Sequence, residues 1–202
     1  MRLIRRLSLT LRKKFGMCSI TGIVMAGGKS KRMGSDKGQL RFGGETLLAR
    51  ACGLLHACCH NVFISGEMEG DAPCPVIPDI FPGTGPLGGL YSVLKNIPAG
   101  KVLIIPVDLP LLNEKMLHFL IENHSDTFDA TVFRTADGIQ PLVAVYEKRI
   151  LPLLEKQIQA RSYKMQNFLQ QIKVNFVQRP EFDPYFLNIN TPGDWEKLQG
   201  YE

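Results

Sequence analysis

The sequence predicts an α/β protein, a three-layer α/β/α sandwich around a mainly parallel, Rossmann-like sheet. Three observations lead to this prediction. Strand-like and helix-like segments alternate along the 202 residues, several strand-like segments are nearly continuous apolar runs, and polar or glycine-rich residues follow those runs. Such runs are typical of strands that helices cover on both faces of the sheet. The ligand crevice of this fold lies beyond the carboxyl ends of its strands.

The strands and helices are predicted from the spacing of apolar residues and from the residues that begin or end such segments. We expect strands at residues 20–26, 61–65, 101–107, 129–133, 141–146 and 173–177. We expect helices at residues 45–58, 86–97, 113–124 and 148–158. Thr46, Asn113 and Thr191 suit helix caps, and Pro192 with Gly193 fits the start of a last helix. Because no repeat or linker divides the sequence, we expect residues 18–202 to form a single domain.

The composition is that of an ordinary globular protein, with 45% hydrophobic and 21% charged residues. No apolar run approaches the ~18–20 residues that span a bilayer, so stable membrane insertion is not expected. The net charge of +5 comes from residues 1–17, which contain six basic residues and no acid. The remainder has 18 basic against 19 acidic residues, so we expect no nucleic-acid binding by the folded body.

The segment 1–17 is a basic amphipathic extension. Leu3, Leu7, Leu11 and Phe15 recur every four residues among the basic side chains, a pattern that could lie on a membrane surface. It lacks the continuous apolar region of a secretory signal. The alternative is an upstream extension outside the core, with Met17 as the effective start.

Five cysteines, at positions 18, 52, 58, 59 and 74, form no CxxC pair and no zinc-type ligand set. An odd count that includes a vicinal pair suits a reducing compartment, where cysteine serves as a small hydrophobic residue. The sequence therefore predicts a cytoplasmic protein.

A glycine-rich loop with many cations follows the first predicted strand, in the stretch IVMAGGKSKRMGSDK. Its glycines let backbone N–H groups approach an anion, Arg32 suits bidentate binding of phosphate oxygens, and Lys37 adds a compact charge. A P-loop needs glycine at position 23, which is isoleucine, and the dinucleotide fingerprint needs glycine at position 29, which is lysine. A phosphate loop of another kind remains, with a solvated surface turn as the alternative.

Two other strand ends carry polar residues. Ser65 ends the strand at 61–65 and Gly66 follows it, and Asp108 follows the buried run at 101–107. We therefore expect one continuous site at this edge of the sheet. A carboxylate there suits Mg²⁺, although an aspartate after a strand can also form a turn or cap.

The loop pattern AGGKSKRMGSDK resembles that of the molybdenum cofactor guanylyltransferases, which belong to the nucleotidyltransferase superfamily. Four further motifs that resemble this family recur in its order, and together they cover the chain from about residue 20 to its end. They are IPDIFPGTGPLGGL (77–90), IIPVDLPLL (104–112), QPLVAVY (140–146) and NINTP (188–192). The resemblance implies a sheet of the nucleotide-diphospho-sugar transferase type.

The resemblance also implies roles for particular residues. It makes Arg32, Lys37 and Asp108 catalytic, with Asp108 as the Mg²⁺ ligand. The nucleotide-binding residues that it implies are Met25, Ala26, Gly27, Gly28, Lys37, Ser65, Asp79, Gly85 and Asp108. The acceptor-binding residues that it implies are Gln140, Pro141, Asn188 and Asn190. Ser65 stands where many relatives have asparagine, which weakens the transfer of that contact.

Structural alternatives stay open in the acceptor half. Asn188 and Asn190 could simply cap the last helix. Arg161 and Lys164, in the stretch 161–169, could bind a second anionic ligand or lie on a solvated helix face.

The implied reaction is transfer of GMP from GTP to the terminal phosphate of molybdenum-loaded molybdopterin, with release of pyrophosphate. Molybdoenzyme apoproteins or their chaperones are further partners that the resemblance implies. One alternative is a cytidylyltransferase that acts on the same cofactor or on a sugar or polyol phosphate. Another is a non-catalytic nucleotide-binding protein that delivers the cofactor.

Overall fold

The computed structural model describes residues 20–26, 37–68, 70–98 and 100–201. The extension at 1–17 and most of the glycine-rich loop, including Gly27, Gly28 and Arg32, lie outside these residues. Lys37 begins a short 3-10 helix, η1 (Lys37–Gln39), but its side chain lies outside the described part.

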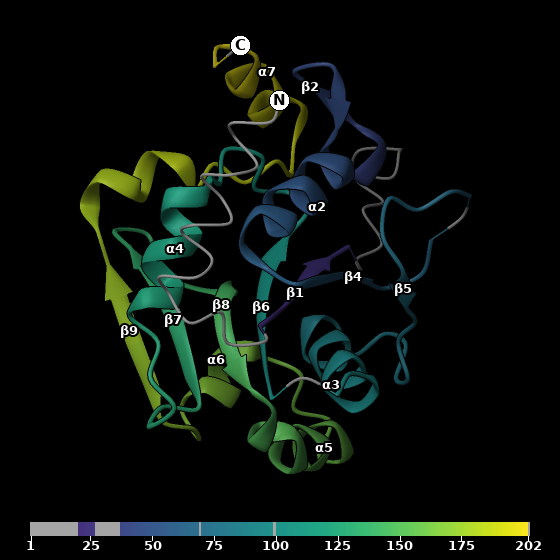
Figure 1. Cartoon of the computed structure of the whole chain (residues 1–202), viewed down its shortest axis with the longest axis vertical. Helices are drawn as coiled ribbons and strands as arrows, with labels where there is room; N and C mark the ends of the chain where they lie inside the picture. The colour runs from purple at the N-terminus through teal and green to yellow at the C-terminus, as the bar shows by residue number, and fades with distance from the viewer. Residues whose placement is uncertain (1–19, 27–36, 69, 99, 202) are drawn as a thin grey trace.

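The core of the protein is a seven-stranded sheet in the order β5-β4-β1-β6-β8-β7-β9 (Figure 1). Its strands are β1 (Thr21–Met25), β4 (Asn61–Ser65), β5 (Val76–Ile77), β6 (Lys101–Pro106), β7 (Ala130–Thr135), β8 (Gly138–Glu147) and β9 (Val174–Gln178). Strand β8 runs antiparallel to both of its neighbours, and the other pairs in the sheet are parallel. The mainly parallel sheet that the sequence predicts is therefore confirmed.

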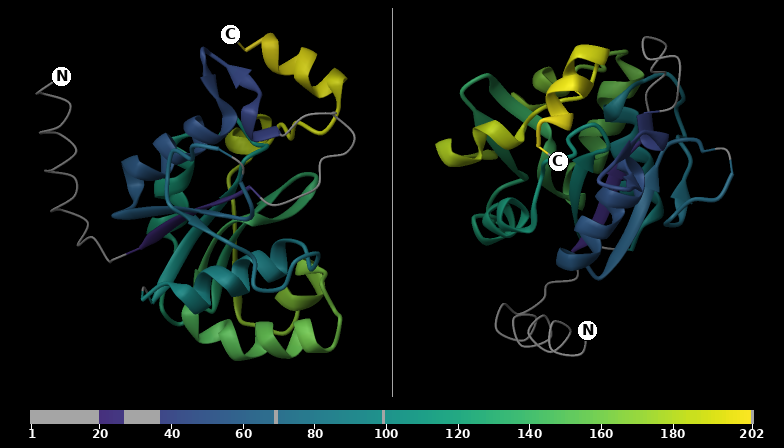
Figure 2. Two further views of the ribbon diagram at one scale, coloured as in Figure 1. Left: turned by 90° about the vertical axis from the view of Figure 1, so that its right-hand side faces the viewer. Right: turned by 90° about the horizontal axis from the view of Figure 1, so that it is seen from above.

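Helices cover both faces of this sheet (Figure 2). One face packs against α2 (Leu47–Cys58), α4 (Glu114–Glu122), α7 (Pro192–Gln199) and the 3-10 helix η3 (Pro180–Tyr185). The other face packs against α3 (Pro86–Asn96), α5 (Leu151–Gln159), which the 3-10 turn η2 (Lys148–Ile150) precedes, and α6 (Met165–Leu169). The three-layer sandwich is confirmed.

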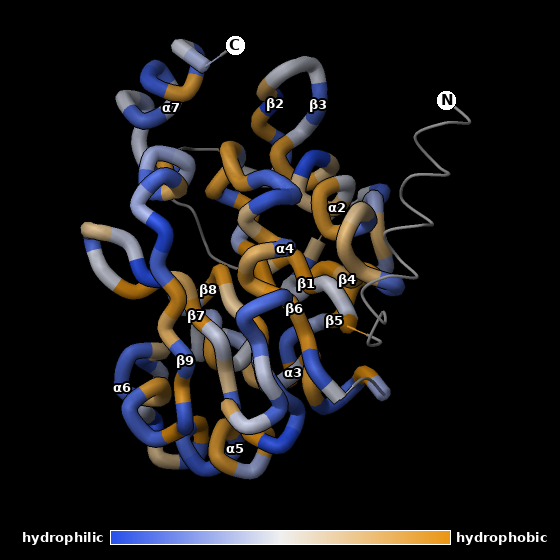
Figure 3. The backbone as a smooth tube through the Cα atoms, turned by 60° about the vertical axis from the view of Figure 1, so that its left-hand side comes forward, coloured by the Kyte–Doolittle hydropathy of each residue, from blue (hydrophilic) through white to orange (hydrophobic). Residues whose placement is uncertain are grey.

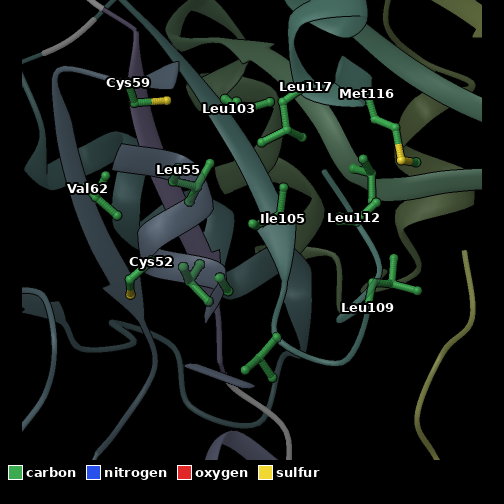
Figure 4. Packing of buried hydrophobic residues seen from close by; sticks show 14 of the residues in the cluster. Cys52, Leu55, Cys59, Val62, Leu103, Ile105, Leu109, Leu112, Met116 and Leu117 are labelled. Atoms are coloured by element: carbon green, nitrogen blue, oxygen red, sulfur yellow. The ribbon is translucent and has the colours of Figure 1, made fainter. Parts of the chain in front are cut away.

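The central strands are apolar on both faces because they feed two separate cores. On β6, Leu103 and Ile105 belong to the cluster beneath α2 and α4, whereas Val102 and Ile104 belong to the cluster above α3. Adjacent residues of a strand point to opposite faces, so a continuous apolar run is what a doubly covered strand requires. Figure 3, in which the chain is coloured by hydropathy, shows the hydrophobic residues at the centre. Figure 4 shows the cluster beneath α2 and α4.

Cysteine contributes to the cluster in Figure 4 as a small hydrophobic side chain. Cys52 is buried within α2, and Cys59 is buried directly after its last residue. Burial raises the pKa of both thiols. All four cysteines that the structure describes have free thiols.

The three predicted helix caps are formed. Thr46 accepts a hydrogen bond from the Ala49 amide at 3.1 Å, and Asn113 accepts one from the Met116 amide at 3.3 Å. Thr191 forms a capping box at the start of α7. These bonds satisfy amides that the first turn of a helix leaves unpaired.

Six short elements of the described part were not expected from the sequence. They are the hairpin strands β2 (Arg41–Phe42) and β3 (Glu45–Thr46), the edge strand β5, the helix α6, and the 3-10 helices η1 and η3. The predicted helix at 45–58 begins two residues later, because Glu45 and Thr46 form β3. Among the described residues, no helix has the length and apolar character that a membrane span needs.

Candidate active site

The strand ends singled out in the sequence meet at one edge of the sheet. Met25 lies in register with Ser65 on one side and with Pro106 on the other. The backbone continues this pairing past the strands: the Ala26 amide donates to the Ser65 carbonyl at 3.1 Å, and the Val107 amide donates to the Met25 carbonyl at 3.3 Å. The carboxyl ends of β1, β4 and β6 are therefore level with one another, and the residues that follow them begin at the same edge of the sheet.

Three predicted nucleotide-binding residues gather around Gly89 in the first turns of α3. A Cβ on Gly89 would lie 2.8 Å from Met25 Cε, 2.9 Å from Ser65 Oγ and 3.6 Å from Asp79 Oδ1. A larger residue at this position would displace these side chains. The absence of a side chain here lets the carboxyl ends of β1 and β4 and the segment after β5 come together against the helix.

Asp79 places a buried, unsatisfied acceptor in this cluster. Its Oδ1 is buried and has no hydrogen-bond partner among the described residues. Desolvation, with a further contribution from Glu67, raises the pKa of the Asp79 carboxyl above its ordinary value. A buried polar atom without a partner is costly, so this oxygen fits a role in which a ligand supplies the donor.

The loop after Asp79 ends at the start of α3. Gly85 is the N-cap residue, with a φ of 67° in the left-handed region that favours glycine, and Pro86 follows it. The Gly85 carbonyl accepts from the Gly88 amide at 3.1 Å. The positive end of an eleven-residue helix therefore adjoins the candidate site.

Asp108 lies next to a predicted acceptor segment. The Ile189 amide donates to the Asp108 carbonyl at 2.9 Å, which brings Asn188 and Asn190 to the end of β6. Asp194 holds this segment, because its Oδ2 accepts from the Asn190 amide at 3.1 Å and from the Thr191 amide at 2.9 Å. Hydrogen bonds from this segment, chiefly the Thr191 hydroxyl, lower the pKa of Asp194.

Two residue types in this part of the chain are ones that can bind a hard divalent cation. A half-buried carboxylate (Asp108) and the side-chain amide of Asn190 offer oxygen ligands, which Mg²⁺ prefers. Both residues lie beyond the strand ends, on the side from which a triphosphate would approach in an α/β fold.

Gln140 and Pro141 lie on β8, the strand next to β6. Gln140 Nε2 donates to Thr135 Oγ1 at 3.2 Å, and the Pro141 carbonyl accepts from the Tyr146 hydroxyl at 2.8 Å. A register shift between Val132 and Phe133 displaces this part of the β7–β8 pair. The two residues are thus ordered by the hairpin itself.

Two cations from the sequence analysis lie around α6. Arg161 follows α5, is exposed and has a φ of 55°, and Lys164 is the N-cap residue of α6. Their assignment to an anionic ligand stays a prediction.

A second group of potential metal ligands lies elsewhere. The ligand atoms of His124, Asp126 and Glu147 are within 4.8 Å of one another. Glu147 is paired in register with Lys101, the first residue of β6, so this group lies at the opposite end of that strand from Asp108. Lys101 Nζ is 2.7 Å from Asp126 Oδ1 and 3.7 Å from Glu147 Oε1, and it supplies positive charge there.

Sequence reasoning missed the residues that hold the Asp79 loop on α3, namely Thr84, Gly88 and Ser92. The available signal was the spacing of small residues at 88, 89 and 92, which puts them on one face of a helix.

Comparisons with known proteins show that a chain with this fold is a nucleotidyltransferase. A family model described as the MobA-like NTP transferase domain matches residues 22–175. A relative from Carboxydothermus hydrogenoformans, named a probable molybdenum cofactor guanylyltransferase, is 37% identical over 90% of this chain and 96% of its own length. A relative from Xanthomonas euvesicatoria pv. vesicatoria, named a molybdenum cofactor guanylyltransferase, is 34% identical over 88% of this chain and 93% of its own.

A solved structure shares the fold. It is the molybdopterin-guanine dinucleotide biosynthesis protein A of Archaeoglobus fulgidus, with a TM-score of 0.77 at 21% identity, covering 90% of this chain and 98% of that one. The chain belongs to the MobA-like NTP transferase family. The resemblance of its motifs to the molybdenum cofactor guanylyltransferases is confirmed.

Proposed function

We propose that this nucleotidyltransferase transfers GMP from GTP to the terminal phosphate of molybdenum-loaded molybdopterin. The products are the guanine dinucleotide form of the cofactor and pyrophosphate. The observation that carries this proposal is the near full-length match to relatives named for this reaction, at identities up to 37%. The gathering of Met25, Ser65 and Asp79 around Gly89 supports it, because the resemblance assigns all three residues to the nucleotide.

The chemistry is an in-line displacement at the α-phosphorus of GTP. An oxygen of the acceptor phosphate forms the new bond, and pyrophosphate leaves. The acceptor phosphate is already ionised, so no general base is needed, and the protein contributes positioning and charge neutralisation. Arg32 and Lys37 bind the triphosphate, and Lys37 also neutralises charge on the transferred group.

Asp108 is the residue that would hold Mg²⁺, with the side-chain oxygen of Asn190 as a further candidate ligand. When bound, the ion screens the repulsion between the two phosphate anions. The backbone contact between the Asp108 carbonyl and the Ile189 amide supports this assignment, because Ile189 lies between Asn188 and Asn190, the two residues of this segment that we propose bind the acceptor.

The remaining site residues divide into those that bind the nucleotide and those that bind the acceptor. Met25, Ala26, Gly27, Gly28, Ser65, Asp79 and Gly85 bind the nucleotide, and Gln140, Pro141, Asn188 and Asn190 bind the acceptor. Molybdoenzyme apoproteins or their chaperones receive the product, and the reaction takes place in the cytoplasm, which the free thiols support.

A nucleotide panel tests the base that the site accepts. We expect GTP with Mg²⁺ to raise the melting temperature by about 5–10 °C at a hundredfold excess over its Kd. CTP, ATP and UTP should each give a clearly smaller shift. A preference for CTP would instead favour a cytidylyltransferase, and GTP binding without pyrophosphate release in the presence of acceptor would favour a non-catalytic carrier.

A further inference from the structure

Ser92 is a buried polar residue in the middle of α3 whose hydroxyl makes two hydrogen bonds. Its side chain is fully buried. The Ser92 hydroxyl donates to the Gly88 carbonyl at 2.7 Å and accepts from the Ile80 amide at 2.8 Å. The first bond is the usual one for a serine within a helix. The second is unusual, because it ties the helix interior to a loop twelve residues earlier in the sequence.

The same loop is fixed at a second point, one helical turn nearer the start of α3. Thr84 Oγ1 donates to the Phe81 carbonyl at 2.7 Å. Thr84 packs so tightly against the helix that a Cβ on Gly88 would lie 1.8 Å from its Oγ1. The ring of Phe81 contacts that of Tyr91, with centroids 5.3 Å apart. The loop from Ile80 to Thr84 therefore lies directly on the small-residue face of α3.

The Ile80 amide belongs to the peptide unit that joins Asp79 to Ile80. A hydrogen bond to it fixes the plane of that peptide and thereby the direction in which the Asp79 side chain leaves the backbone. This constraint matters because Asp79 Oδ1 has no hydrogen bond among the described residues to hold it. The position of the carboxylate beside Gly89 therefore depends on the backbone that carries it.

We propose that Ser92 is a positioning residue for the nucleotide site, whose hydroxyl holds the Asp79–Ile80 peptide so that the Asp79 carboxylate is directed at bound nucleotide. The proposal rests on the proposed function, since it requires that Asp79 contacts GTP. Ser92 itself contacts no substrate. It acts before binding by removing alternative orientations of the carboxylate, so its contribution is preorganisation.

The test is a double-mutant cycle between Ser92 and Asp79, with GTP and Mg²⁺ binding measured by calorimetry. Ser92→Ala should raise the Kd for GTP about three- to tenfold. The same change in the Asp79→Asn background should raise it by less than twofold, because the carboxylate to be positioned is gone. In the transfer reaction, Ser92→Ala should raise the KM for GTP and leave kcat unchanged, as expected for a loss of uniform binding.

Thr131→Ala is the matched control. Thr131 is also fully buried, and its hydroxyl is 2.9 Å from His124 Nδ1 at the other end of the sheet. This variant should lose stability and keep the wild-type Kd. If Ser92→Ala does not fold, Ser92→Cys keeps the size of the side chain and weakens both hydrogen bonds, and it should give a smaller rise of the same kind.

An unchanged Kd in Ser92→Ala would overturn the proposal, and so would an equal rise in both backgrounds or an equal rise in Thr131→Ala. These outcomes differ from failure of the proposed function. In that case the wild-type protein itself would bind no GTP or would release no pyrophosphate.

Discussion

At the scale of single residues, the Asp79 carboxylate lowers the stability of the folded protein, although we propose that it contributes to nucleotide binding. Its carboxyl is desolvated, so its pKa is raised on folding. For an acid with a raised pKa, the ionised form is less favourable in the folded than in the unfolded protein. The resulting loss of stability is absent below the pKa of the unfolded chain and is complete above the pKa of the folded one.

We therefore predict that Asp79→Asn melts at a higher temperature than the wild type at pH 7, without nucleotide. The two proteins should melt at nearly the same temperature near pH 3, where the carboxyl is protonated in both states. The same variant should bind GTP more weakly. Thermal melts from pH 3 to pH 8 measure the first effect and calorimetry the second. A lower melting temperature for Asp79→Asn at pH 7 contradicts this interpretation.

At the scale of elements, the start of α7 connects helix capping to the site. Thr191 accepts from the Asp194 amide, and Asp194 accepts from the amides of Asn190 and Thr191. These bonds fix the turn that carries Asn188 and Asn190 beside Asp108. A capping box at the start of another helix would only stabilise that helix, but this one also orders predicted acceptor residues.

Removal of the cap should therefore have two effects. Thr191→Ala is expected to lower the free energy of unfolding by about 1 kcal/mol. It should also raise the KM for molybdopterin more than the KM for GTP, since only the acceptor segment loosens. Asn113→Ala, which removes the cap of α4, should cost similar stability without the selective effect on KM. Equal KM changes in both variants would show that the cap of α7 has no particular role in acceptor binding.

The elements also show what the sequence could predict. The apolar run of β6 and the cap residues of α2, α4 and α7 carry local signals, and the structure confirms them. Strands β2, β3 and β5 have two residues each, too few to show a period of two. Helix α6 has five residues, and although its buried Met165, Phe168 and Leu169 follow the helical i, i+3, i+4 spacing, one turn is too short to establish a period.

The candidate site was predictable to a similar degree. The position of Ser65 at the end of one buried strand and of Asp108 after another showed which edge of the sheet to consider. The role of Ser92 was only partly predictable. The spacing of small residues at 88, 89 and 92 indicates one face of a helix, but the bond from the Ile80 amide to Ser92 joins two elements and has no local sequence pattern. The gathering of Met25, Ser65 and Asp79 around Gly89 likewise depends on the packing of α3 against the sheet.

At the scale of the whole molecule, the candidate active site and a separate group of charged residues lie at opposite ends of β6. The His124, Asp126 and Glu147 group, with Lys101, lies at the start of this strand, and Asp108 follows its end. A six-residue strand spans about 20 Å, so the two groups do not interact directly. Asp126 is therefore a suitable control aspartate for the site, with an exposed side chain far from Asp108.

The most direct test of the account is the transfer reaction itself. Purified protein is incubated with GTP, Mg²⁺ and molybdenum-loaded molybdopterin, and pyrophosphate and the guanine dinucleotide are measured together. We predict equal amounts of both products from the wild type and from Asp126→Ala, and no detectable product from folded Asp108→Ala or Lys37→Ala. Near-normal turnover in either of the last two variants, or no dinucleotide from the wild type, would contradict the account.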